Sequence, residues 1–134
     1  MSETLNVCGL TVERGTKLRT YLPVPDTNVK IPLTIINGEN DGPTLLITAG
    51  IHGGEYPGIA AAMELGHDIE PDHVTGCLIM MHPVNIQGFW ARREMIVPED
   101  GKNLNRVFPG DPTGTLADKT AYLISNNFFP IADF

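Results

Sequence analysis

His52 and Glu55 lie three residues apart in the stretch AGIHGGEYPG, within a group of glycines. Glycines let the backbone turn tightly and give a ligand close access. On a helical turn, a spacing of three points both side chains the same way. Imidazole nitrogen and carboxylate oxygen are ligands of catalytic zinc, which usually takes three protein ligands and keeps a position for water. The pair therefore predicts two ligands of a metal site.

A second group of polar residues lies in PEDGKNLNRVFPG, residues 98 to 110. Arg106 precedes the apolar residues of VFP, and an arginine fork can bind a carboxylate through two parallel hydrogen bonds. Asn105 adds a neutral donor. These two residues predict a receptor for a substrate carboxylate. Upstream, Arg92 and Arg93 are candidates to polarise a carbonyl and stabilise its developing oxyanion.

The elements that must position these residues form a strand–helix–strand pattern. The apolar run 44–51 predicts a strand buried on both faces, 56–69 a helix, and 76–84 a further buried strand. This order indicates an α/β protein. Ligands bind at the carboxyl ends of strands in such sheets, and His52 and Glu55 follow the first strand directly.

The rest of the chain is less regular. Residues 16–23 and 28–37 predict two strands, and 38–43 predicts a turn from its glycines and asparagine. The long irregular region 85–115 is of the kind that usually carries function. A helix is expected over 116–128. The apolar end, FFPIADF, is expected to begin another buried strand.

Composition limits the classes of partner. The chain has 134 residues, of which 42% are hydrophobic and 19% charged, which is typical of one globular domain over residues 1–134. Its net charge of -7 argues against nucleic acid and anionic membranes as partners. A small carboxylate-bearing substrate remains compatible, because four of the nine cations lie between Arg92 and Arg106.

Targeting and redox features are few. The two cysteines, Cys8 and Cys77, form no CxxC pattern and are expected to be buried thiols in a reducing compartment. The N-terminus has neither a basic segment nor an apolar one, so no signal peptide is expected. No apolar run approaches the roughly 20 residues of a membrane helix. A cytoplasmic location follows as the expectation.

The motifs GIHGGEYPG, NIQGFWAR and PEDGKNLNRVFPG, in this order, resemble the succinylglutamate desuccinylase/aspartoacylase family of the zinc carboxypeptidase superfamily. The resemblance implies a mixed, mostly buried sheet flanked by helices. It implies Zn²⁺ as cofactor, with His52 and Glu55 as ligands. It also implies that Asn105 and Arg106 bind the substrate carboxylate, and that Arg92, in preference to Arg93, assists the carbonyl as a catalytic residue. The implied reaction is hydrolysis of an amide or ester in a small N-acyl amino acid.

The resemblance also indicates what is missing. The family's third zinc ligand, a histidine, and its general base glutamate are expected beyond Phe134, so the chain is expected to be the N-terminal part of a zinc-carboxypeptidase-like catalytic domain. Of the other histidines, only His82 lies near the site, and it is expected to be a packed strand residue. Many relatives have an aspartate where this chain has Asn103. That change is expected to weaken the orientation of Arg106 or of a ligand.

Two other functions remain open from the sequence. One is a zinc carboxypeptidase that cleaves peptides. The other is a truncated, non-catalytic protein that binds carboxylates or a protein partner through Arg92 and Arg106. A homo-oligomer that covers an unfinished sheet edge is also expected to be possible. Zinc content, and assays of N-acyl amino acids against short peptides, separate these readings.

Overall fold

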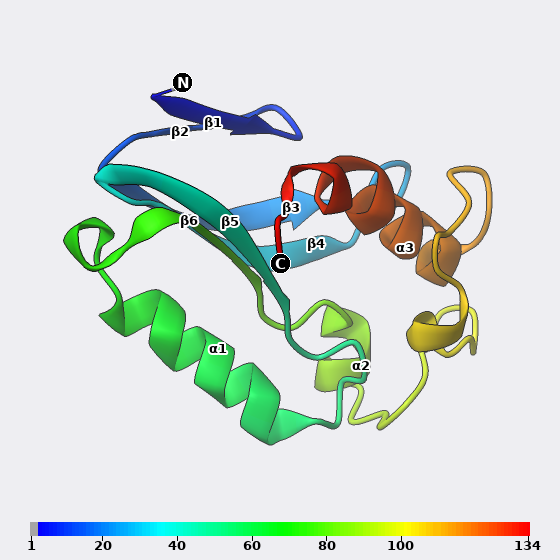
Figure 1. Ribbon diagram of the computed structural model, residues 1–134. Helices are drawn as coiled ribbons and strands as arrows, with labels where there is room; N and C mark the ends of the chain where they lie inside the picture. The colour runs from blue at the N-terminus through cyan, green and yellow to red at the C-terminus, as the bar shows by residue number, and fades with distance from the viewer. Residues whose placement is uncertain (1–2) are drawn as a thin grey trace.

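The computed structural model describes residues 3–134 and contains two sheets (Figure 1). A small hairpin pairs β1 (Thr4–Val7) with β2 (Leu10–Glu13). The main sheet has the strand order β3-β4-β6-β5. Its strands are β3 (Thr16–Pro23), β4 (Lys30–Asn37), β5 (Asn40–Thr48) and β6 (Thr75–Met81). The sheet is mixed, because β4 runs antiparallel to both neighbours while β5 and β6 are parallel.

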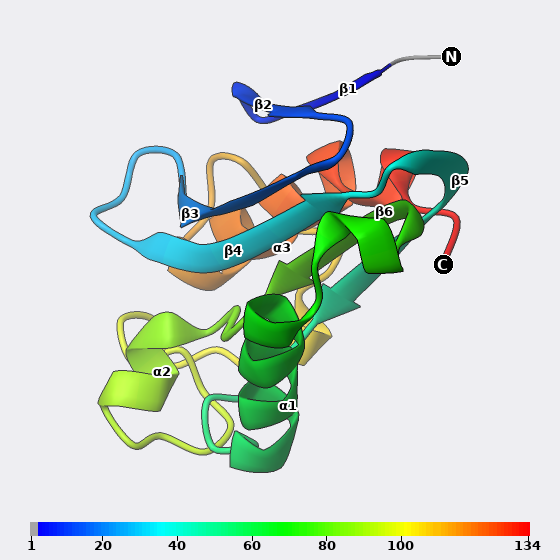
Figure 2. The ribbon, with the colours of Figure 1, turned by 90° about the vertical axis from the view of Figure 1, so that its left-hand side faces the viewer.

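Helices cover both faces of the main sheet, which confirms the α/β class (Figures 1 and 2). α1 (Tyr56–Asp68) connects β5 to β6 and lies on one face, whereas α3 (Leu116–Asn127) lies on the other. The short helices are η1 (Pro71–His73), α2 (Ile86–Trp90), η2 (Leu104–Arg106) and η3 (Phe129–Ile131). The region expected to be irregular therefore contains two short helices, α2 and η2.

Buried apolar residues on both faces of β4 explain why helices must cover both faces of the main sheet. Ile31, Leu33 and Ile35 belong to the main core with α3, whereas Ile36 packs with Leu78 and Met80 in a second cluster. Successive strand residues point to opposite faces, so a strand that is apolar at both parities must be covered twice. β4 meets this condition, and so does β6, whose Ile79 and Met81 belong to the main core while Leu78 and Met80 belong to the second cluster.

The expectation for β5 was wrong in two respects. The strand begins at Asn40, inside the segment expected to be a turn, and it forms an edge of the main sheet. Residues 40–43 are exposed, and Leu45 is 41% exposed, so β5 is not buried on both faces. Leu46 and Ile47 are only partly buried, and they pack against the two clusters on opposite faces of the sheet.

Two other expectations need correction. Cys8 is exposed at the β1–β2 turn, where it has a positive φ of 49° beside Gly9; only Cys77 is buried. The end of the chain forms η3 and only then reaches the free edge of β5. There the Phe134 N–H donates to the Thr44 carbonyl, and the Leu46 N–H donates to the Phe134 carbonyl. These two bonds have the pattern of one parallel ladder step.

None of the helices in residues 3–134 has the length and apolar character needed to span a bilayer.

Lys17 caps the carboxyl end of α1. Its Nζ donates to the carbonyls of Gly66, His67 and Ile69 at 3.2, 3.0 and 2.7 Å, and it forms an ion pair with Glu70 at 2.8 Å. A lysine in this place satisfies carbonyls that a helix end leaves without partners.

Replacing Lys17 with Met is expected to lower the free energy of unfolding by about 1–3 kcal/mol, because partly buried carbonyls lose their charged donor while the apolar stem is retained. Urea denaturation measures this change. Lys30→Met, at an exposed position, serves as the control and is expected to shift stability by less than about 0.5 kcal/mol. Equal stabilities of the two variants would contradict the capping role.

Candidate metal and carboxylate site

The turn that carries His52 begins where the sheet ends. Beyond β5, the Ala49 N–H donates to the Met81 carbonyl, and the Asn85 N–H donates to the Gly50 carbonyl, so the ladder with the β6 side continues past both strands. Gly50 has a φ of 71°, which turns the chain out of the sheet. The chain then reaches Glu55, which occupies the N-cap position of α1. His52 and Glu55 thus lie between the end of a strand and the start of a helix.

The double glycine of this turn is required by close packing. A Cβ on Gly53 would lie 2.4 Å from backbone atoms of Gly88 and Phe89. A Cβ on Gly54 would lie 2.9 Å from the Cα of Glu94. The Gly54 N–H also donates to the Glu94 carbonyl at 3.2 Å. The turn is therefore fixed against α2 and the loop that follows it.

Three polar side chains converge at this turn. Nδ1 of His52 lies 2.9 Å from Oε1 of Glu55, and Nε2 of His52 lies 2.9 Å from Oδ1 of Asn103. The His52 side chain is 16% exposed and that of Glu55 is 63% exposed, so the imidazole is held while the carboxylate faces solvent. The hydrogen bonds with Glu55 and then with Asn103 raise the pKa of His52, and the charge of Arg106 acts weakly in the opposite direction.

Asn103 and Arg106 reach this position on the η2 turn. Asn103 is its N-cap and accepts the N–H of Asn105 at 3.0 Å. Leu104 is fully buried and anchors the turn, whereas Asn105 and Arg106 are exposed. Because the charge of Arg106 acts on the pKa of His52, its guanidinium lies within electrostatic range of the imidazole. The fold thus brings the segment of His52 and the segment of Asn103, 51 positions apart in the sequence, into contact.

The loop before η2 is fixed to the amino end of α3. Oδ2 of Asp100 accepts the N–H of Ala117 at 2.8 Å, and Nζ of Lys102 lies 2.5 Å from Oδ2 of Asp118. Asp118 also forms a capping box with Thr115. The contact with Lys102 is the main cause that lowers the pKa of Asp118. These contacts hold the loop before η2 against the start of α3.

Arg92 lines a cavity whose lining does not include the three converging side chains. This cavity of about 470 Å³ lies between α1 and α2 and is also lined by Tyr56, Ile59, Ala60, Met63, Phe89 and Trp90. Its φ is 55°, an uncommon value for a residue other than glycine. Of the arginines, Arg106 is the one whose charge affects the pKa of His52, which it lowers.

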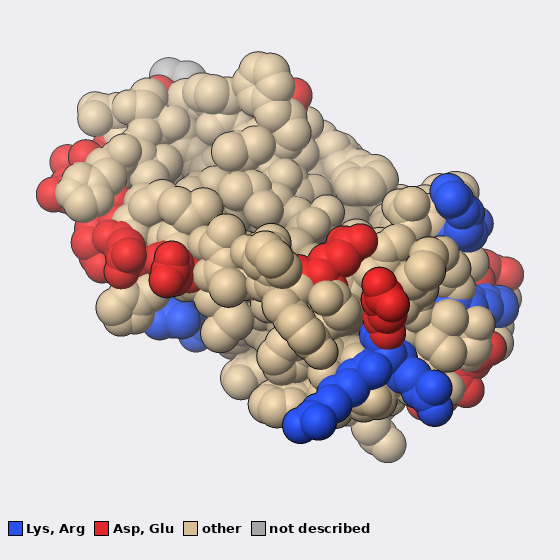
Figure 3. Space-filling model, turned by 90° about the horizontal axis from the view of Figure 1, so that it is seen from below, with Lys and Arg blue, Asp and Glu red and all other residues tan. Residues whose placement is uncertain are grey.

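Charge is unevenly distributed on the face below the sheet. Figure 3 shows a largely uncharged middle, mostly acidic side chains towards the left end, and Lys and Arg side chains mixed with acidic ones towards the right end. A cavity of about 1000 Å³ is lined by residues of the β3–β4 side, α2 and the loop after it, including Tyr21, Lys30, Gln87, Trp90 and Glu99. His52, Glu55 and Arg106 do not line it, so size alone does not identify the site.

His82 is a packed strand-end residue, as expected. It is buried, its Nε2 lies 2.8 Å from Oγ1 of Thr34, and its backbone N–H donates to the Pro32 carbonyl. Burial lowers its pKa. The group is thus held in the neutral form inside the fold.

A titration of stability is expected from His82. Because its folded pKa lies below the unfolded value of about 6.5, the neutral form stabilises the protein above that pH, and this contribution is lost as pH falls from about 6.5 towards the folded pKa. His52, with its raised pKa, acts in the opposite sense in the metal-free protein. Urea denaturation from pH 8 to 5 gives the unfolding free energies of the wild type and of His82→Gln. Their difference isolates the contribution of His82 to the pH dependence of stability. A pH-independent difference would contradict it.

His52 and Glu55 have the chemical types of metal ligands, but two side chains are fewer than the three that a catalytic zinc usually takes. Within residues 3–134, no cluster of three or more His, Cys, Asp and Glu side chains could hold a metal ion. Both nitrogens of His52 nevertheless face oxygen acceptors, so a proton or another cation has to lie between Nδ1 and the Glu55 carboxylate. An imidazole nitrogen and a carboxylate oxygen are donor types that zinc sites use. The contact between Asn103 and His52 was missed from the sequence, because it joins residues 51 positions apart.

The fold is found in solved structures. The product-bound ectoine utilization protein EutE (DoeB) from Ruegeria pomeroyi is 37% identical with a TM-score of 0.83, over 90% of this chain and 38% of that one. A succinylglutamate desuccinylase/aspartoacylase from Rhodobacter sphaeroides is 34% identical with a TM-score of 0.80, over 90% of this chain and 39% of that one.

A curated relative is the N-alpha-acetyl-L-2,4-diaminobutyric acid deacetylase of Halomonas elongata, which is 39% identical over 120 residues. The match covers 84% of this chain and 34% of the relative, so the chain spans about a third of that protein's length. These similarities define a class of hydrolases that act on acyl amino acids. The Succinylglutamate desuccinylase/Aspartoacylase catalytic domain matches residues 41–133, and the chain belongs to this family.

Proposed function

We propose that the intact protein is a zinc-dependent deacylase of small N-acyl amino acids, and that this chain supplies part of its catalytic domain. The observation that carries the proposal is the position of His52, whose nitrogens face Glu55 at 2.9 Å and Asn103 at 2.9 Å. His52 and Glu55 would hold the metal. The third ligand and the general base are proposed to come from outside residues 3–134.

The chain's own residues have two tasks in this proposal. Asn105 and Arg106, exposed beside His52, bind the substrate carboxylate through a neutral amide and a planar fork. This contact orients the substrate so that its acyl carbonyl lies at the Glu55 side of the turn. The chemistry that zinc supplies in such sites is polarisation of a carbonyl and activation of water near neutral pH. Arg92 remains a candidate for contact with the acyl carbonyl, although it lines a neighbouring cavity here.

Relatives suggest the substrate to test first. The Halomonas elongata relative is described as a deacetylase of N-alpha-acetyl-L-2,4-diaminobutyric acid. We propose N-acetyl and N-succinyl amino acids as the substrate class, in preference to peptides. Product release from both classes of compound, measured with zinc-loaded protein, separates the deacylase from a carboxypeptidase. Hydrolysis of peptides alone would contradict the proposal.

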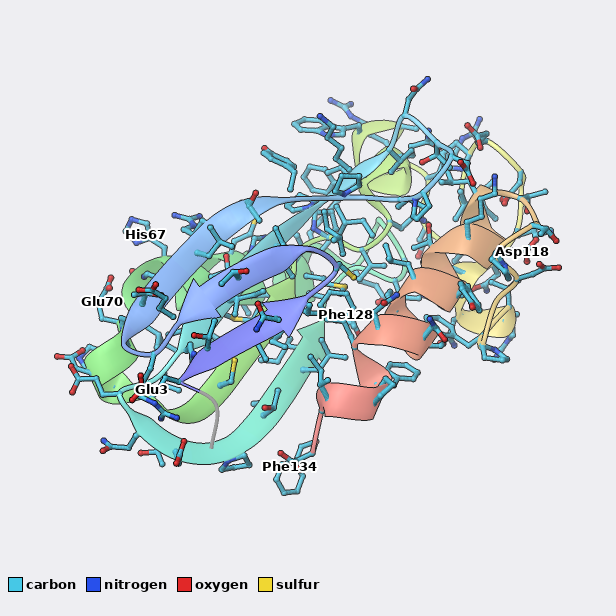
Figure 4. The ribbon with its side chains drawn as sticks, turned by 90° about the horizontal axis from the view of Figure 1, so that it is seen from above. Glu3, His67, Glu70, Asp118, Phe128 and Phe134 are labelled. Carbon is cyan, nitrogen blue, oxygen red and sulfur yellow. The ribbon has the colours of Figure 1, made fainter. Side chains whose placement is uncertain are left out.

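Zinc binding tests the metal site independently of turnover. Isothermal titration calorimetry with zinc chloride is expected to show binding that His52→Ala abolishes. His67→Ala is a matched control, because His67 also pairs with a carboxylate, Asp68 at 2.8 Å, but lies exposed at the opposite end of α1 (Figure 4). Loss of zinc binding in the His67 variant, with retention in the His52 variant, would contradict the site.

A further inference from the structure

The cavity of about 1000 Å³ beside α2 has two walls that come from distant parts of the sequence. One wall is the β3–β4 side, with Tyr21 and Lys30, and the other is α2 and the loop after it, with Trp90 and Glu99. Figures 1 and 2 both show α2 beneath β4. The volume lies at the upper end of the range found for small-molecule sites. None of the residues assigned to the metal or to the substrate carboxylate lines this cavity, so its occupant would be bound separately.

Hydrogen bonds hold both walls of this cavity in place. Asn85 is 4% exposed; its side chain accepts the Gly88 N–H at 2.9 Å and donates to the Ile96 carbonyl at 3.0 Å, which ties α2 to the loop that follows it. In the other wall, the Val24 N–H donates to the Val29 carbonyl at 2.9 Å and closes the turn between β3 and β4. The cavity is therefore pre-formed, as small-molecule sites usually are.

Two aromatic rings line the cavity and remain open to solvent. Tyr21 is 63% exposed and Trp90 is 75% exposed. The Trp90 ring makes an edge contact with Phe89, with 5.1 Å between the ring centroids, so it is supported from one side. An aromatic face attracts both apolar groups and ammonium groups. The two rings therefore suit a ligand that carries either or both.

The cavity also carries one charge of each sign. Lys30 belongs to the β4 wall, and Glu99 belongs to the loop after α2. Within residues 3–134, neither of them forms an ion pair. A ligand with both an ammonium and a carboxylate can pair with both side chains, whereas a ligand with a single charge pairs with one and is repelled by the other.

We propose that this cavity binds a small zwitterion with an aromatic or apolar group, a chemistry that both free amino acids and short peptides offer. The ammonium lies at Glu99 and the face of Trp90, the carboxylate faces Lys30, and the apolar group covers Tyr21. Acylation of the α-amine removes the ammonium, so a free amino acid is bound in preference to its N-acyl form. The inference does not rest on the proposed function, because it uses no residue of the metal or carboxylate site.

The fluorescence of Trp90 tests the proposal directly, because Trp90 is the single tryptophan of the 134-residue chain. L-phenylalanine and the peptide Ala-Phe-Ala are the probes, and at least one is expected to move the emission to shorter wavelength as the exposed ring is covered. Their saturation curves show which source binds more tightly. N-acetylphenylalanine and phenylalanine amide each lack one charge, and each is expected to bind about 2- to 5-fold more weakly than phenylalanine. No shift with either probe, or equal affinities for free and blocked forms, would overturn the proposal.

Matched variants assign the two charges. Glu99→Gln is expected to abolish the preference for phenylalanine over its N-acetyl form and to keep the preference over the amide. Lys30→Met is expected to do the reverse. Arg106→Ala changes the candidate substrate site and is expected to leave both preferences unaltered. If Arg106→Ala abolished them, or if the Glu99 and Lys30 variants changed neither, the proposed cavity would not be the site.

A further variant tests the ring itself. Trp90→Leu is expected to weaken phenylalanine binding by about 10-fold in isothermal titration calorimetry, because the aromatic face is lost. Met95→Leu is the control and is expected to bind as wild type, because Met95 is exposed but does not line the cavity. Unaltered binding in the Trp90 variant would contradict the proposal. So would an emission shift on dilution of the ligand-free protein, because it would show that a second copy covers Trp90.

Discussion

Alanine in place of Arg106 is expected to lower kcat/KM for a carboxylate-bearing N-acyl amino acid by about 100-fold in the intact protein. Hydrogen bonds to charged groups contribute about 1.5–3 kcal/mol each, and a tenfold change in rate corresponds to about 1.4 kcal/mol. Arg106 is exposed, so the free energy of unfolding is expected to change little. Steady-state kinetics together with urea denaturation measure both quantities.

The chemistry of the substrate supplies the control for this prediction. The corresponding substrate amide lacks the carboxylate, so Arg106→Ala is expected to affect its hydrolysis only slightly. Arg106→Lys keeps the charge without the planar fork, and an intermediate loss is expected. Arg19→Ala, an exposed arginine on β3, is expected to leave kcat/KM unchanged. Equal losses for the carboxylate and the amide would show that Arg106 does not read the carboxylate.

Alanine in place of Phe128 is expected to lower the free energy of unfolding by about 3–5 kcal/mol, because the ring is large and leaves a cavity in a closed core. Phe128 is fully buried where α3 ends, and it belongs to the main core with residues from the hairpin, the sheet and α3. Figure 4 shows Phe128 between the sheet and α3. A loss of this size is a large part of the 5–15 kcal/mol typical of a domain. Urea denaturation followed by circular dichroism measures it.

Phe134 provides the matched control, since its ring is 78% exposed and its recorded bonds to β5 are made by backbone atoms (Figure 4). Phe134→Ala is expected to change stability by less than about 0.5 kcal/mol. If Phe128→Ala proves too unstable to purify, Phe128→Leu, with a smaller loss, keeps the comparison measurable. Equal stability of the Phe128 and Phe134 variants would contradict the described core.

Local sequence was sufficient where an element is determined by its own residues. α1 begins at Tyr56 as expected, because the glycine turn ends there and Pro57 is tolerated in the first helical turn. The helix of residues 116–127 and the strand of residues 16–23 also lie where the sequence placed them. In each case the decisive signal lies within the element or directly beside it in the sequence.

Sequence reasoning failed where burial depends on distant segments. The apolar run after Pro43 did not reveal that β5 is an edge strand, because its neighbours are set by topology and not by its own residues. The exposure of Cys8 likewise depends on a hairpin that was not expected.

The candidate site follows the same division. The pairing of His52 with Glu55 could be predicted from a spacing of three residues. The contact between His52 and Asn103 could not, because it requires the sheet, α2 and the anchored loop before η2 to fold together. The position of Arg92 beside an apolar cavity depends in the same way on the packing of α2 against α1.

The most direct test of the account is anomalous diffraction at the zinc absorption edge from crystals of the intact protein grown with zinc. The account predicts a peak between Nδ1 of His52 and the carboxylate of Glu55. A peak at another pair, such as His67 and Asp68, with none at His52, would contradict it.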